Sequence, residues 1–167
     1  MKVFSIVNLK LTWGGYFNST LYLLPCQKHQ DINVFWFFGV KKTETDMNTM
    51  FQCCYKLTNL DVSHFDTSKV TDMGWMFFGC IGLTSLNVNN FDTSKVTDMS
   101  YMFTDTAGLT SLDLINFDTS KVTNFQKMFK NSSNLKEIKV SSKWVVSSSA
   151  TITDMFTNCG VSSVTTV

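Results

Sequence analysis

The stretch FDTSKVTDM places a carboxylate, hydroxyls and an amine close together, and these side-chain types serve acid–base and nucleophilic catalysis. It begins at Phe65, recurs at Phe91 and returns as FDTSKVTNF from Phe117, an interval of 26 residues each time. A catalytic site needs its residues once, whereas a stacked structure needs a copy in every layer. We therefore interpret the stretch as architecture. We identify no catalytic residue, and we expect the protein not to be an enzyme.

A carboxylate ladder is the first alternative to consider, because calcium-binding repeats use one. The acids in question are Asp66, Asp92 and Asp118. Each has a lysine three residues later, and the glycine-rich turns of calcium-binding repeats are missing. We expect each Asp to accept a hydrogen bond from its own backbone, with the lysine relieving the stacked charge. We predict no metal site and no cofactor.

The cysteines offer thiol chemistry. Cys54, Cys80 and Cys159 occupy one slot of the repeat, which Thr106 and Ser132 fill in the middle copies. A nucleophile would not tolerate this exchange, so we expect a small buried residue there. A disulfide between Cys54 and Cys80 stays open as an alternative if the chain is exported. The two histidines lie far from any cysteine pair, and the spacing fits no zinc motif.

Composition limits the function classes. The 167 residues are 44% hydrophobic and 16% charged, with a formal net charge of +1. A core is therefore expected, and there is no basic field for a nucleic-acid partner. No run of apolar residues is long enough for a membrane span, so we predict none.

Each repeat has two halves. The second half reads L-x-x-L-x-L and alternates apolar and polar residues as a half-buried strand does. A phenylalanine such as Phe91 then closes this half and should point into the core. The apolar positions are Leu57, Leu60, Val62, Leu83, Leu86, Val88, Leu109, Leu112, Leu114, Leu135, Ile138 and Val140.

The first half reads TDMxxMF. Met73, Met76 and Phe77 have the i, i+3, i+4 spacing of one face of a helical turn, with Thr71 at a suitable N-cap position. The turn is short, so a 3₁₀ helix is an alternative to an α-helix. These halves predict an α/β repeat solenoid, leucine-rich-repeat-like, with a parallel β-sheet on a concave face and short helical turns opposite.

The sequence LTSLNVNNFDTSKVTDMSYMF at 83–103 and its copies resemble the BspA-type leucine-rich repeat of bacterial surface proteins and lipoproteins. The resemblance covers roughly residues 45–160. It implies a non-enzymatic repeat at the cell surface or secreted, acting in adhesion. The implied partner is a protein or glycan ligand, since the resemblance implies binding to a host or to another partner. We expect a monomer.

Three segments follow from the repeat. Residues 41–142 form the predicted solenoid, and residues 143–167 form a divergent last coil and tail. Residues 1–40 carry no repeat. They are either an irregular arm that caps the solenoid, a degenerate secretion signal, or a segment foreign to the array.

The candidate binding site is the set of outward-pointing strand residues, a grid of mainly small polar groups on the predicted concave face. They lack the aromatic and arginine anchors of an interaction hot spot, so they are also consistent with a solvated sheet. The second hypothesis is thus a structural spacer, or a fragment of a larger surface protein, with no ligand of its own. The set is Asn59, Asp61, Ser63, Ser85, Asn87, Asn89, Ser111, Asp113, Ile115, Glu137, Lys139 and Ser141.

Overall fold

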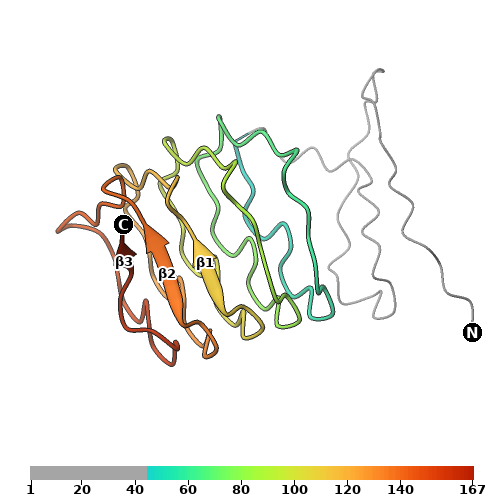
Figure 1. Ribbon diagram of the computed structural model, residues 1–167. Helices are drawn as coiled ribbons and strands as arrows, with labels where there is room; N and C mark the ends of the chain where they lie inside the picture. The colour runs from blue at the N-terminus through green and yellow to red at the C-terminus, as the bar shows by residue number, and fades with distance from the viewer. Residues whose placement is uncertain (1–44) are drawn as a thin grey trace, which may run out of the picture.

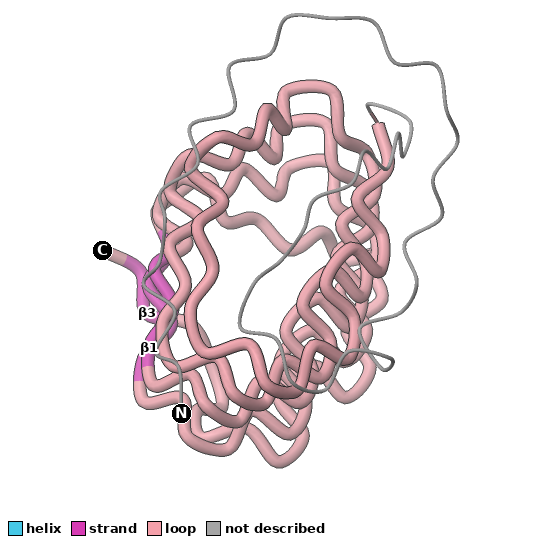
Figure 2. The backbone as a smooth tube through the Cα atoms, turned by 90° about the vertical axis from the view of Figure 1, so that its right-hand side faces the viewer, coloured by secondary structure: helices cyan, strands magenta, loops and turns pink. Residues whose placement is uncertain are grey.

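In the computed structural model, the chain winds into successive coils that lie side by side (Figure 1). Seen at right angles, the coils superimpose around a common interior (Figure 2). The structure describes residues 45–167, so the predictions for residues 1–40 lie outside the described residues. We number the coils by their first residues: coils 1 to 4 begin at Thr45, Thr71, Thr97 and Thr123, and the shorter coil 5 begins at Ala150.

Three strands form one parallel sheet in the order β1-β2-β3. They are β1 (Ser111–Asp113), β2 (Glu137–Val140) and β3 (Thr165–Thr166). Leu112 pairs with Ile138, so the register between β1 and β2 equals the 26-residue repeat. Strands therefore form within the predicted segments 109–114 and 135–140. The predicted segments 57–62 and 83–88 are not strands, and β3 lies in the tail, where we predicted none.

Residues 45–167 contain no helix, so the predicted helical turns are not present. The TDMxxMF segments instead form hydrogen-bonded turns. In coil 2, the N–H groups of Met76, Phe78 and Cys80 donate to the carbonyl three residues back, at 3.3, 3.1 and 3.1 Å. The alternate N–H groups, of Met73, Trp75, Phe77 and Gly79, donate to carbonyls of coil 3 at 2.9–3.0 Å.

The backbone conformation explains why no helix propagates. Trp75 has φ 59° and Gly79 has φ 72°, both in the left-handed region that interrupts a right-handed helix. The other coils repeat this pair of conformations four residues apart. Met73, Met76 and Phe77 are nevertheless fully buried, so the predicted core face is confirmed without the predicted helix. The equivalent residues with positive φ are Thr49, Cys53, Tyr101, Asp105, Lys127, Asn131, Asp154 and Asn158.

This result removes the cause of the predicted concavity. We expected a concave strand side because helices are wider than strands. Here the turn halves of all five coils, and the strand halves of coils 3 to 5, are joined to neighbouring coils by backbone hydrogen bonds, which impose a spacing of about 4.8 Å. We therefore call the surface that carries the predicted site the strand face. No helix in the described part of the chain is long and apolar enough to cross a membrane.

The core is a column of stacked rings flanked by aliphatic side chains. Five phenylalanines, one per coil, have successive centroid distances of 5.5, 5.6, 5.8 and 5.4 Å. The rings are close to parallel, with interplanar angles of 3°, 9°, 1° and 19°. Phe91 and Phe117 are also buried, which confirms their predicted inward position, whereas the equivalent Phe65 is half-buried. The column consists of Phe51, Phe77, Phe103, Phe129 and Phe156.

Candidate binding site on the strand face

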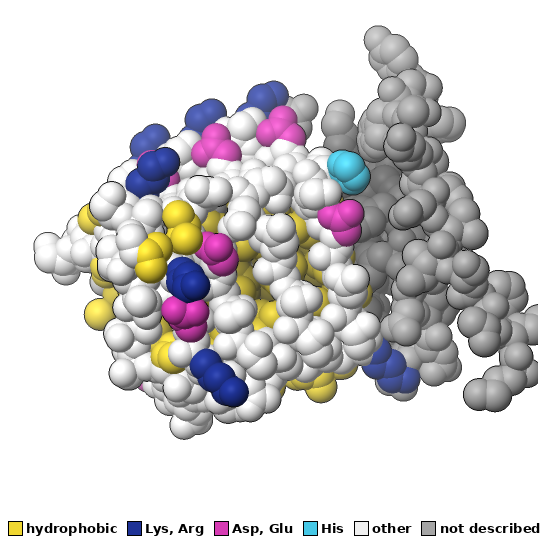
Figure 3. Space-filling view, viewed as in Figure 1, with side chains coloured by type: hydrophobic (Ala, Val, Ile, Leu, Met, Phe, Trp, Pro, Cys, Tyr) yellow, Lys and Arg dark blue, Asp and Glu magenta, His cyan; other side chains and the backbone are white. Residues whose placement is uncertain are grey.

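The strand face holds the twelve predicted residues in rows across the coils. Figure 3 shows this side of the molecule, with apolar surface between columns of polar side chains. Ile115, Glu137, Lys139 and Ser141 are half-buried, which removes part of the predicted grid at its C-terminal end. The exposed members are Asn59, Asp61, Ser63, Ser85, Asn87, Asn89, Ser111 and Asp113.

One row of side chains on this face is held by hydrogen bonds from the adjacent backbone. The Oδ1 atoms of Asp61, Asn87 and Asp113 each accept a hydrogen bond from the backbone N–H two residues later, at 2.9, 3.0 and 3.1 Å. These bonds restrain the three side chains, all of which are exposed. The row is therefore ordered before any ligand arrives.

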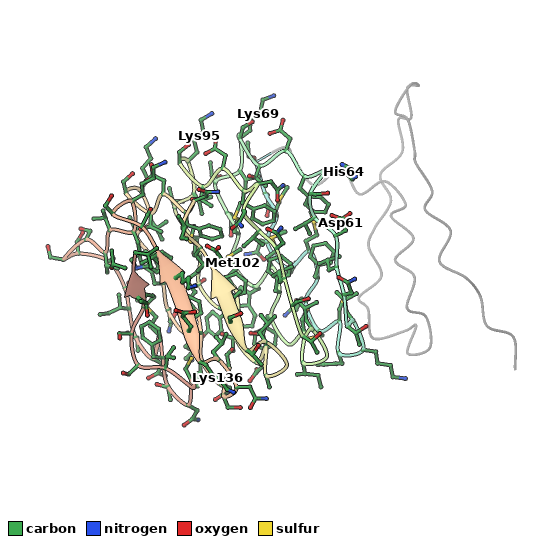
Figure 4. All side chains as sticks on the ribbon, viewed as in Figure 1. Asp61, His64, Lys69, Lys95, Met102 and Lys136 are labelled. Atoms are coloured by element: carbon green, nitrogen blue, oxygen red, sulfur yellow. The ribbon has the colours of Figure 1, made fainter. Side chains whose placement is uncertain are left out.

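Four of the twelve predicted residues are charged: Asp61 lies at one end of the strand face, Asp113 between the ends, and Glu137 and Lys139 at the other end. Hydrogen bonds from Ser63 lower the pKa of the Asp61 carboxyl, and the nearby His64 lowers it further. Asp61 and His64 lie close to each other at one end (Figure 4). At the other end, Lys139 and Glu137 form an ion pair of 3.4 Å, with both side chains about two-fifths exposed. An exposed pair of this kind contributes about 0–1 kcal/mol to stability.

The aspartates of the carboxylate ladder each accept a hydrogen bond from the backbone of their own turn, as predicted. Asp66, Asp92 and Asp118 each accept the backbone N–H of the serine two residues later, at 3.0 Å. Hydrogen bonds from these serines lower the pKa of all three carboxyls. Lys95 donates to the Ser68 carbonyl at 2.9 Å, and it projects from the same edge as Lys69 (Figure 4). Within residues 45–167, no three His, Cys, Asp or Glu side chains are grouped so that they could hold a metal ion.

The cysteine slot contains a hydrogen-bond donor. Cys80 is a free thiol, so the alternative disulfide to Cys54 is not formed. Its Sγ donates to the Phe51 carbonyl at 3.2 Å, and Ser132 Oγ donates to the Phe103 carbonyl at 2.7 Å. Cys54, Cys80 and Ser132 are buried, which confirms the buried residue predicted for this slot, whereas Cys159 in coil 5 is only half-buried. The slot holds Cys, Thr or Ser in different coils, and all three side chains can donate a hydrogen bond to a carbonyl. The sequence analysis missed this shared role as a donor.

A buried threonine ladder also escaped the sequence analysis. Thr93 Oγ1 donates to the Asp118 carbonyl at 3.0 Å and accepts the Asp118 N–H at 2.8 Å. Thr67 and Thr119 make the same pair of bonds to the following coil. The signal was present, since FDT is identical in all three copies and Thr carries both a donor and acceptors.

Aromatic side chains gather in the turn half of coils 2 and 3, away from the predicted site. Trp75 stacks on Tyr101 with a centroid distance of 3.9 Å and an interplanar angle of 14°. The ring centroid of Phe78 lies 4.7 Å from that of Trp75. Lys127 Nζ is 5.2 Å from the Tyr101 ring centroid and 3.1 Å from its hydroxyl, a hydrogen bond that raises the Lys127 pKa. The rings thus contact each other and the lysine.

The comparisons with known proteins give one match. Neither the curated proteins nor the solved structures contain a match to this chain. A family model described as "Mycoplasma protein of unknown function, DUF285" matches residues 45–165, the part of the chain that contains the repeats. The chain therefore belongs to the DUF285 family.

Proposed function

We propose that this chain is a leucine-rich-repeat-like solenoid that binds a protein or glycan through its strand face and performs no chemistry. The coil-to-coil hydrogen bonds and the 26-residue strand register support the solenoid. The resemblance to BspA-type repeats supports a place at the cell surface or in the medium, a role in adhesion, and a host-derived partner. We further propose that the chain acts as a monomer.

The observation that carries the proposal is the ordered row of Asp61, Asn87 and Asp113. Their Oδ1 atoms are held at 2.9–3.1 Å from backbone N–H groups, although all three side chains are exposed. Side chains that are already fixed lose little conformational entropy when a ligand binds, which favours affinity. Equivalent groups in neighbouring coils repeat at about 4.8 Å.

The chemistry of the face favours a hydroxyl-rich ligand within this proposal. None of the twelve residues is aromatic or arginine, the residue types that anchor protein interfaces. Carboxylates accept hydrogen bonds from hydroxyl groups, and amides and serine hydroxyls both donate and accept them. A glycan chain that crosses several coils would meet such groups in every coil.

The test is a binding screen of the whole chain against glycans and host matrix proteins. We expect Asn87→Lys, in the middle of the row, and Asp113→Lys, at its C-terminal end, each to weaken binding of any captured ligand at least tenfold. The control is Ser133→Lys, which adds one positive charge, as Asn87→Lys does, at an exposed position outside the strand face. Equal binding by the row variants and the control would contradict the proposed site.

The second candidate is a structural spacer or a fragment of a larger surface protein, with no ligand of its own. The same Oδ1 hydrogen bonds favour it, because they show that Asp61, Asn87 and Asp113 serve their own turns. A folded chain that captures nothing in the screen would support the spacer and reject the binding module. Mass spectrometry of the mature N-terminus in producing cells, together with cell fractionation, tests the surface or secreted location.

A further inference from the structure

We draw no further inference here: the strongest candidate, the outer surface of coil 5, where Ile152 is 53% exposed and the backbone N–H groups of Asp154, Phe156 and Asn158 have no acceptor among the described residues, carries nothing because nothing in the structure shows what covers it.

Discussion

The two halves of each coil are held together in different ways. The turn half, such as 72–80 in coil 2, donates four backbone hydrogen bonds to the next coil at each of the four steps from coil 1 to coil 5. The strand half is paired as a sheet only in coils 3, 4 and 5, through β1, β2 and β3. Between 57–62 and 83–88, a single backbone bond of 3.5 Å joins Thr84 to Thr58.

Burial in the strand half differs between these regions at one position of the repeat, although Val62, Leu83 and Val88 in coils 1 and 2 are fully buried. Met73 and Phe77 in the turn half are fully buried, and so are Leu112 (1% exposed) and Ile138 (0%) where strands pair. Leu86, at the equivalent position of the unpaired coil 2, is only half-buried. We infer that the turn half holds the stack together, while the strand half of coils 1 and 2 contributes less.

The largest expected effect comes from a ring in the middle of the phenylalanine column. Phe103 is fully buried between Phe77 and Phe129, so Phe103→Ala should lower the free energy of unfolding by about 3–5 kcal/mol. Phe78→Ala is the matched control, because Phe78 is half-buried outside the column. Urea denaturation measures both variants. Equal losses of unfolding free energy would mean that the phenylalanine column is not what stabilises the turn half.

A pair of leucine substitutions tests the difference within the strand half. Leu112→Ala removes a fully buried side chain of the paired strand β1 and should lower the free energy of unfolding by about 2–5 kcal/mol. Leu86→Ala makes the same change where the strand half is unpaired, and its cost should be clearly smaller because Leu86 is already partly in contact with water. If Leu86→Ala costs as much as Leu112→Ala, the strand half is equally important in both regions.

A smaller effect is expected from the buried threonine ladder that bridges the coils. Thr93→Val keeps the shape of the side chain but leaves the Asp118 N–H and carbonyl without their partner, which should cost about 1–3 kcal/mol. The control is Thr97→Val, because Thr97 is exposed and water can replace its 3.2 Å bond to the Thr71 carbonyl. Thermal unfolding distinguishes the two. A neutral Thr93→Val would show that the ladder adds nothing to the coil-to-coil contacts.

Periodicity correctly predicted most of the buried residues, whereas Leu57, Leu60, Phe65 and Leu86 are only half-buried. Met73, Phe77, Phe91 and Leu112 recur at fixed intervals, and burial of apolar area decides their position whatever the local backbone does. The outward position of Asp61 and the backbone bonds of Asp92 followed from the same pattern and from the turn chemistry of Asp.

The backbone of the turn half could not be predicted in the same way. The spacing of Met73, Met76 and Phe77 suits a helix, but Trp75 and Tyr101 adopt positive φ, which ordinary propensities assign to Gly or Asn. Contacts between neighbouring coils, such as the stacking of Trp75 on Tyr101, offset this local cost and are invisible to local propensity. The coil-to-coil hydrogen bonds escaped prediction for the same reason.

Amide hydrogen exchange of the whole chain tests most directly whether the turn half holds the stack. The backbone N–H groups of Phe77 and Phe103, which donate to the next coil at 3.0 and 2.9 Å, should exchange only when the whole structure unfolds. The N–H groups of residues 59–61 and 85–87 should exchange much faster, because within residues 45–167 no coil-to-coil bond protects them. Slow exchange at 59–61 and 85–87, or fast exchange at Phe77 and Phe103, would contradict the account.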